Sequence, residues 1–207
     1  MTDKLSIYNG ALLMTGSRRL ASLTENVESR RVLDDIWDNG GVRRCLERGF
    51  WNHAMRTVRA DYSPSVEPPF GYQYAFDKPT DYVKTYSICT DEYFKNPLLN
   101  YHDELNYWFS DYETLYIRYV SSDEDYGMDM SQWPGSFTEY VEGYFALKAI
   151  KRLTDAAADK NDLKEDVRKL LIHAKASDAL KDPIQFAPET SWQRSRHGVM
   201  RRRPPYR

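Results

Sequence analysis

The fold is decided by a helix-forming stretch, residues 136–153, which reads SFTEYVEGYFALKAIKRL. Ser136 and Glu139 match a capping box, in which the two side chains satisfy free backbone N–H groups at a helix N-terminus. Large apolar side chains then recur at the spacing of one helical face, namely Phe137, Tyr140, Val141, Tyr144 and Phe145. We therefore expect a long amphipathic helix here.

Further helices are expected on both sides of this stretch. Residues 3–15 place apolar side chains on one face, and Gly16 then ends the helix because glycine tolerates the left-handed C′ position. Residues 26–37 follow, and a short helical segment leads from there to Gly49. The last long helix, residues 162–180, carries an apolar face and begins with acidic residues, which favour a helix N-terminus.

The middle of the chain, about residues 50–126, has the composition of β-strands. Aromatic residues alternate with others over residues 70–76, and residues 82–89 and 115–120 are rich in the aromatic and β-branched side chains that strands favour. Five prolines in this region argue against long helices. Ser110-Asp111 is interpreted as a hairpin turn between two strands.

These segments predict a mainly α (α+β) fold, a four-helix bundle with two helices before and two after a central β-rich insertion at about residues 50–126. The helical domain is expected to span residues 1–182. Pro183 ends the regular structure, and residues 183–207 have too few apolar side chains for a core of their own. We expect this last segment to form an extended, basic C-terminal arm.

Charge is divided unevenly between the body and this arm. Six arginines and one glutamate give residues 188–207 a charge of +5, and because the whole chain carries −2, residues 1–187 carry −7. An acidic body followed by a basic tail indicates that the two regions face different partners.

The composition restricts the class of protein. Hydrophobic residues make up 41% of the chain, which is enough for a core. The mean hydropathy is −0.73, and no apolar run approaches the roughly 18 residues of a membrane span. The first residues lack the features of a signal peptide, so we expect a protein made in the cytoplasm that stays there or leaves inside a larger particle. Cys45 and Cys89 are expected to be reduced thiols.

The sequence contains no recognisable motif for catalysis or metal binding. The four histidines show no metal-ligand spacing, and His102-Asp103-Glu104 is interpreted as a solvated turn. Residues 123–129 are similar to a calcium loop, but Gly127 comes one place early and Pro134 stands where the loop needs glutamate. No phosphate-binding, dinucleotide-binding, nucleophile-elbow or zinc-protease motif is present.

The aromatic middle has an alternative interpretation, because aromatic and basic side chains together can bind single-stranded nucleic acid. Between Phe70 and Tyr126, however, the basic residues are sparse against many acids; they are Lys78, Lys84, Lys95 and Arg118. A groove that follows phosphates needs positive charge. The tyrosines are therefore expected to be half-buried on a sheet or at a subunit contact.

Several segments, in a fixed order along the chain, are similar to those of one protein family. They are residues 9–16 (NGALLMTG), 20–25 (LASLTE), 30–37 (RRVLDDIW), 49–56 (GFWNHAMR), 69–81 (PFGYQYAFDKPTD) and 115–120 (LYIRYV), and then Ser191-Trp192 with Arg194 and Arg196. On these residues the chain resembles the head–tail adaptor (connector) proteins of tailed bacteriophages, the tail tubular protein A-like family, which also occurs in gene transfer agents. One departure is His53, where the family often has an aromatic residue.

The resemblance implies a ring, usually of twelve copies, between the portal and a downstream neck or tail protein. The arm residues expected to bind the portal are Trp192, Arg194, Arg196, Arg201, Arg202 and Arg203. The family-motif residues expected to pack the fold are Trp51, Arg56, Phe70, Tyr72, Pro79 and Asp81. Further copies of the chain are partners in the ring, DNA is passing cargo and no membrane is involved. We expect no catalytic residue, cofactor or metal, and a location in the virion neck after assembly in the host cytoplasm.

The charge distribution agrees with these implications. An acidic body repeated around a bore repels DNA phosphates, so a duplex would slide through it. Arginine and tryptophan are frequent hot spots of protein interfaces, which suits a gripping arm. Three other interpretations stay open: a nucleic-acid-binding module that uses the arginine-rich arm, an arm that only aids solubility, and an enzyme of unrecognised type.

Overall fold

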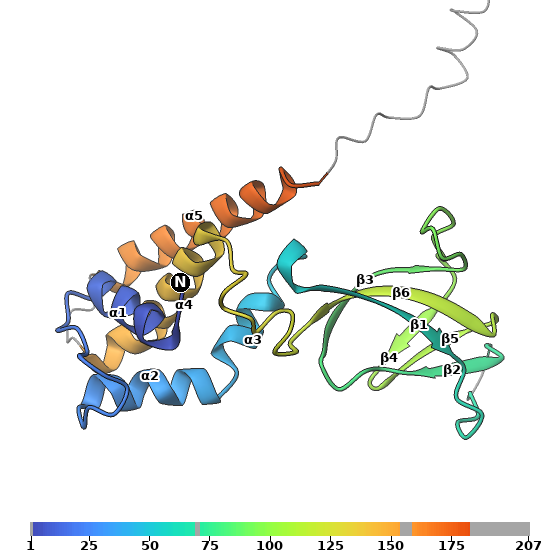
Figure 1. The fold of residues 1–207 in the computed structure, drawn as a ribbon, viewed down its shortest axis with the longest axis horizontal. Helices are drawn as coiled ribbons and strands as arrows, with labels where there is room; N and C mark the ends of the chain where they lie inside the picture. The colour runs from blue at the N-terminus through green and yellow to red at the C-terminus, as the bar shows by residue number, and fades with distance from the viewer. Residues whose placement is uncertain (1, 69–70, 154–158, 183–207) are drawn as a thin grey trace, which may run out of the picture.

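A computed structural model describes residues 2–68, 71–153 and 159–182. Helices gather at one end of the molecule and strands at the other, as Figure 1 shows. We call these two parts the helical lobe and the sheet lobe. No helix in the described ranges is long and apolar enough to cross a membrane.

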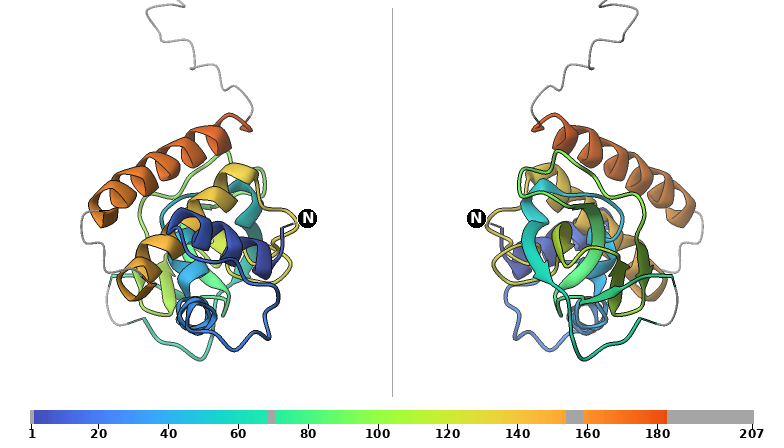
Figure 2. Two further views of the ribbon diagram at one scale, coloured as in Figure 1. Left: turned by 90° about the vertical axis from the view of Figure 1, so that its left-hand side faces the viewer. Right: turned by 90° about the vertical axis from the view of Figure 1, so that its right-hand side faces the viewer.

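The helical lobe is built from five α-helices within the described residues. They are α1 (Lys4–Met14), α2 (Glu28–Asp38), α3 (Gly41–Leu46), α4 (Gly135–Leu153) and α5 (Asp159–Ala179). A 3-10 turn, η1 (Asn52–Ala54), leads from this lobe toward the strands. The end-on views in Figure 2 show α5 running across the outside of the lobe.

Helix α1 is capped by Asp3 at its start and is followed by Gly16 after its C-cap. The Asp3 carboxylate accepts a hydrogen bond from the backbone N–H of Ser6 at 2.7 Å, and the Ser6 hydroxyl accepts one from the backbone N–H of Asp3 at 2.9 Å. Gly16 follows the C-cap with a φ of 69°, so the predicted left-handed stop is confirmed.

Helix α4 lies at the centre of the lobe, and its buried side chains include Val141, Phe145 and Ala146. The ring centroid of Phe145 is 6.3 Å from that of Tyr8 on α1. At Gly143 an added Cβ would lie 3.1 Å from side-chain atoms of α5, so glycine permits the close approach of these two helices. The long helix expected at 136–153 is therefore the element on which the others pack.

The sheet lobe contains two three-stranded antiparallel sheets. Sheet A has the order β1 (Met55–Asp61), β6 (Thr114–Ser121) and β3 (Tyr82–Cys89). Sheet B has the order β2 (Tyr74–Asp77), β5 (Tyr107–Ser110) and β4 (His102–Glu104).

The two sheets pack on each other around a second core. Sheet B contributes Phe76 and Trp108, and sheet A contributes Leu115, Ile117 and Tyr119. All five side chains are fully buried. Since successive side chains of a strand point to opposite faces, the odd-numbered residues of β6 face sheet B. We call this the inner face of sheet A, and the opposite face the outer face.

The predicted four-helix bundle with a β-rich insertion is wrong. The six strands of the described residues lie within residues 50–126, but they bury a core of their own instead of extending from a bundle. The described helices number five, because residues 41–46 form a full helix that carries the buried Val42, Cys45 and Leu46. The fold is α+β, with a helical lobe beside a sheet lobe.

Three local predictions are also wrong. Ser110-Asp111 does not join a hairpin, because β5 pairs with β2 and β4 while β6 pairs with β1 and β3. Ser136 lies inside α4 instead of capping it, since the helix already begins at Gly135. His102-Asp103-Glu104 forms the strand β4 rather than a turn, although all three side chains are exposed.

Candidate functional site

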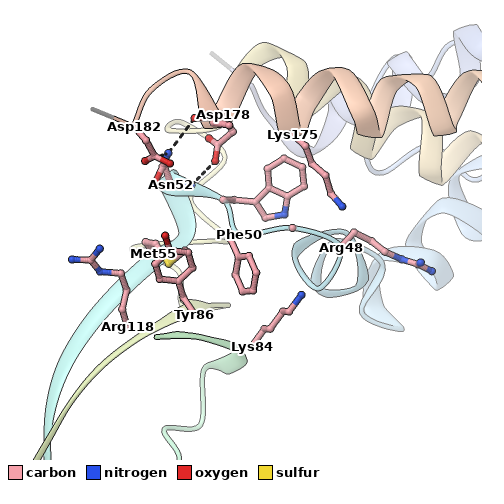
Figure 3. Close-up of a pocket in the computed structure, with 13 residues that line it drawn as sticks. Arg48, Phe50, Asn52, Met55, Lys84, Tyr86, Arg118, Lys175, Asp178 and Asp182 are labelled. Atoms are coloured by element: carbon pink, nitrogen blue, oxygen red, sulfur yellow. Dashed lines mark hydrogen bonds between the residues drawn. The ribbon is translucent and has the colours of Figure 1, made fainter. Parts of the chain in front are cut away.

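A cavity of about 350 Å³ lies where the two lobes meet. Its walls come from the segment 48–55, from strands β3 and β6 on the outer face of sheet A, and from the C-terminal part of α5 (Figure 3). We call it the junction pocket. Its volume is at the small end of the roughly 300–1,000 Å³ that ligand pockets occupy.

The segment that forms the pocket wall is fixed by Trp51. The Trp51 side chain is 1% exposed, its ring centroid lies 4.8 Å from that of Phe137, and its indole N–H donates to the carbonyl of Cys45 at 3.2 Å. A Cβ at Gly49 would lie 2.7 Å from this indole ring, so a glycine is needed at that position. Trp51 thus anchors the pocket wall in the helical core.

Asn52 ties the same segment to the end of α5. Its backbone N–H donates to the Asp178 carboxylate at 2.9 Å, and its side-chain amide donates to the Asp182 carboxylate at 3.1 Å. Figure 3 shows Asn52 beside Asp178 and Asp182, with dashed lines to Asp178. These contacts hold α5 over the junction.

Four cationic side chains line the pocket: Arg48, Lys84, Arg118 and Lys175. Within the described ranges, none of them lies in an ion pair, although ten ion pairs join other lysine or arginine side chains to carboxylates there. Figure 3 shows Lys175 extending from α5, and Lys84 from β3, into the space between the helix and the sheet. The pocket therefore presents positive charge that the described carboxylates do not neutralise.

Aromatic rings hold two of these cations. The Lys84 ammonium lies 4.2 Å from the ring centroid of Phe50, and the Arg118 guanidinium lies 4.5 Å from that of Phe94. Phe50 and Tyr86 pack edge to face at 5.2 Å, and they are 42% and 47% exposed. A cation–π contact orients a cation and leaves its N–H groups able to donate to an anion.

The two acidic residues of the pocket, Asp178 and Asp182, already accept hydrogen bonds from Asn52. Asp178 is buried, and one of its carboxylate oxygens lies 3.7 Å from the Lys181 ammonium. Burial raises the pKa of Asp178 above its usual value. With four cations and two carboxylates, the lining carries a formal charge of +2 on a chain whose net charge is −2.

On the inner face of sheet A, by contrast, charges are paired. An Arg56 guanidinium nitrogen lies 3.0 Å from the Asp81 carboxylate, which also accepts hydrogen bonds from the hydroxyls of Tyr119 and Ser121. Burial raises the pKa of Asp81, but the hydrogen bonds from Ser121, Arg56 and Tyr119 outweigh it and leave the pKa below 3.8. Tyr119 is fully buried, so this cluster belongs to the structural core.

The family-motif residues in the described ranges fall into this framework. Trp51 is core, and Arg56 and Asp81, which come from two separate segments, meet in one ion pair. Pro79 accepts a hydrogen bond from the backbone of Tyr82 in the turn before β3. Tyr72 donates to Asn100 at 3.3 Å. Phe70 lies outside the described residues, as does the whole expected portal-binding arm, with Trp192, Arg194, Arg196, Arg201, Arg202 and Arg203.

Two side chains that could react, Cys45 and His53, are placed in apolar surroundings. Burial raises the pKa of the Cys45 thiol to about 12, and burial with the nearby Lys181 lowers the pKa of His53 to about 4. No group of three potential metal ligands occurs in the described ranges. What the junction pocket can do chemically is bind an anion between cations and aromatic rings.

Sequence reasoning missed this pocket, although two of its members were in view. Lys84 and Arg118 are among the few basic residues of the aromatic middle, and their sparseness there argues only against a groove that follows the phosphates of a nucleic acid. Arg48 and Lys175 come from the two flanking helical regions. A register shift between Tyr82 and Lys84 and the alternation of β6 place Lys84 and Arg118 on one face of sheet A, and no local sequence pattern predicts that the two side chains lie on the same face.

Comparison of the sequence with protein-family models gives no match, and comparison with curated proteins gives none.

Proposed function

We propose that this chain is a structural head–tail adaptor of a tailed bacteriophage or gene transfer agent. In this role it forms a ring, of twelve copies by the resemblance, between the portal and the downstream neck or tail protein. DNA passes through the bore as cargo. The C-terminal arm, with Trp192 and its arginines, is the proposed contact with the portal.

The observation that carries the proposal is the meeting of the two most specific segments of the resemblance. Arg56 belongs to the segment GFWNHAMR and Asp81 to the segment PFGYQYAFDKPTD, and the two side chains form an ion pair 3.0 Å long. In the same cluster, Asp81 accepts from Ser121, one residue beyond the segment LYIRYV. Segments that resemble those of one family thus meet around a single carboxylate, that of Asp81.

The charge of the chain supports the same role. Residues 1–187 carry −7, which opposes adhesion of DNA to the wall of a bore. A ring also needs two different lateral faces on each subunit, since a heterologous contact closes by rotation. Exposed apolar side chains on α1, on α5 and directly after α5, which include Leu13, Ile172 and Leu180, are available for such contacts.

The test is electron microscopy of the purified full-length protein mixed with the portal protein encoded in the same genome. We expect a ring of added density on one face of the portal. A chain that ends at Asp182 should lose this binding, whereas substitution of the exposed Lys164 by alanine should keep it. A full-length protein that leaves the portal bare would refute the adaptor role.

The same protein should be titrated with duplex DNA at two salt concentrations. The adaptor role predicts weak binding. Tight binding that falls steeply with salt, and that is abolished when Arg201, Arg202 and Arg203 are replaced by alanine, would instead support the nucleic-acid-binding module.

A further inference from the structure

We infer that the junction pocket binds a short acidic segment of another protein, in which a carboxylate side chain stands next to an aromatic or aliphatic one. The inference concerns residues 48–55, β3, β6 and α5, and it does not depend on the arm.

The first argument is the unpaired positive charge. Lys84 and Lys175 extend from opposite walls into the pocket. In the sheet lobe, by contrast, Arg56, Arg59 and Lys78 have carboxylate partners. A carboxylate that enters the pocket would accept hydrogen bonds from two ammonium groups, and such charge-assisted bonds are the stronger kind.

The second argument is the apolar surface beside these cations. Phe50 and Tyr86 are each more than two-fifths exposed, and Met55 lines the same wall. Exposed aromatic side chains next to cations suit a ligand that carries both an acid and an apolar group, because burial of the apolar group adds to the charge contact. A small inorganic anion would use only the cations.

The third argument separates a peptide from a nucleic acid. A base needs a free aromatic face on which to stack, but the Lys84 ammonium lies 4.2 Å from the ring centroid of Phe50, and Tyr86 packs against the same ring. Asp178 and Asp182 stand at the end of the pocket and would repel the next phosphates of a continuous strand. One or two carboxylates fit this arrangement better than a polyanion.

The charge of the segment that follows Asp182 favours a partner protein, rather than this segment, as the occupant of the pocket. Asp182, the last residue described before the tail, lines the pocket, and six arginines follow it in residues 188–207. A tail of charge +5 is a poor match for a cationic pocket. If the proposed portal-binding role of the arm is right, a partner with an acidic surface would meet the arm and the pocket together.

The experiment measures fluorescence anisotropy of a labelled peptide of alternating glutamate and phenylalanine with the full-length protein. The matched probes are the same peptide with glutamine in place of glutamate, and an oligothymidylate. We expect the glutamate peptide to bind most tightly. The double variant Lys84→Gln/Lys175→Gln should weaken it roughly fivefold to tenfold, as loss of two charge contacts predicts.

The control is Lys151→Gln/Lys164→Gln, which removes the same charge from exposed positions of α4 and α5 outside the pocket. It should leave the affinity within about twofold, since charges beyond a Debye length are screened. Equal weakening by the control would mean a general charge effect and would overturn the inference. Denaturant unfolding of both double variants shows whether either has lost its fold.

Three other results would also overturn it. They are equal affinity for the glutamine peptide, tighter pocket-dependent binding of the oligothymidylate, and self-association of the protein that Lys84→Gln/Lys175→Gln abolishes, which would make a second copy the occupant. Because these measurements use no portal protein, failure of the adaptor role and failure of the pocket are distinguished.

Discussion

On the inner face of sheet A, Arg56 has a carboxylate partner, Asp81, at 3.0 Å. On the outer face, Arg118 and Lys84 contact aromatic rings and have no carboxylate partner in the described ranges. Arg118 and Tyr119 are neighbours on β6, yet Tyr119 donates to Asp81 while Arg118 lines the junction pocket.

The difference shows how one strand separates stability from binding. A buried charge must be paired, because an unpaired charge in a core is very costly. A charge at an open cavity is solvated and needs no partner in the free protein. Removal of a charged group from the inner face is therefore expected to lower the free energy of unfolding, whereas removal of a cation from the outer face is expected to leave it almost unchanged. The wall beneath the outer face, in contrast, depends on apolar packing.

The largest expected effect tests that wall. Trp51→Ala removes a fully buried indole between the pocket and the core and should lower the free energy of unfolding by about 3–5 kcal/mol. Its matched control is Phe50→Ala, the neighbouring aromatic residue, which is 42% exposed and should cost about 1 kcal/mol or less. Urea unfolding followed by circular dichroism measures both. Similar losses for the two variants would show that Trp51 does not anchor the junction.

The next effect tests the paired face. Asp81→Ala removes the hydrogen-bond acceptor of the buried Tyr119 hydroxyl and of the Arg56 guanidinium, which keeps only Asp123 at 3.7 Å, and should lower the free energy of unfolding by about 2–4 kcal/mol. Asp125→Ala, at an exposed aspartate outside any ion pair of the described residues, should change it by less than about 0.5 kcal/mol. A loss at Asp81 no greater than at Asp125 would contradict the pairing.

A pH series sharpens the same test. Because the pKa of folded Asp81 lies below its unfolded value of 3.8, its ionised form stabilises the fold above pH 3.8, and this stabilisation is lost as the pH falls through the folded pKa. The gap in unfolding free energy between wild type and Asp81→Asn should therefore be widest near neutral pH and narrow in acid. A gap that stays constant down to the lowest pH at which both proteins fold would exclude this linkage.

The helices were predictable from the sequence because their signals are local. Apolar spacing and the Gly16 stop lie within the element they define, and α1 and α4 were found within one residue of their expected starts. The strands β3 and β6 were also found at their expected positions. Helix α3 was expected only as a short segment and was left out of the bundle.

The sheet pairing was not predictable, because it joins residues far apart in the chain. Ser110-Asp111 has the composition of a hairpin turn, but the strands on its two sides belong to different sheets, β5 to sheet B and β6 to sheet A. Strand β1 escaped detection because its residues, MRTVRAD, are mostly polar, and only the pairing with β6 makes them a strand. The junction pocket was not predictable for the same reason, because its four cations come from four segments that are far apart in the chain.

The smallest expected effect completes the comparison of the two faces. Lys84→Met removes the ammonium that lies over the Phe50 ring and keeps an unbranched apolar side chain, and should change the free energy of unfolding by less than about 0.5 kcal/mol, since a cation without an ion pair contributes little. Arg56→Met, the same kind of change on the inner face, should cost about 2 kcal/mol or more, because it leaves Asp81 unpaired. Unfolding curves in urea measure both variants. Equal costs would mean that Lys84 is as structural as Arg56, whereas a stable Lys84→Met protein that no longer binds the glutamate peptide would assign the outer face to recognition.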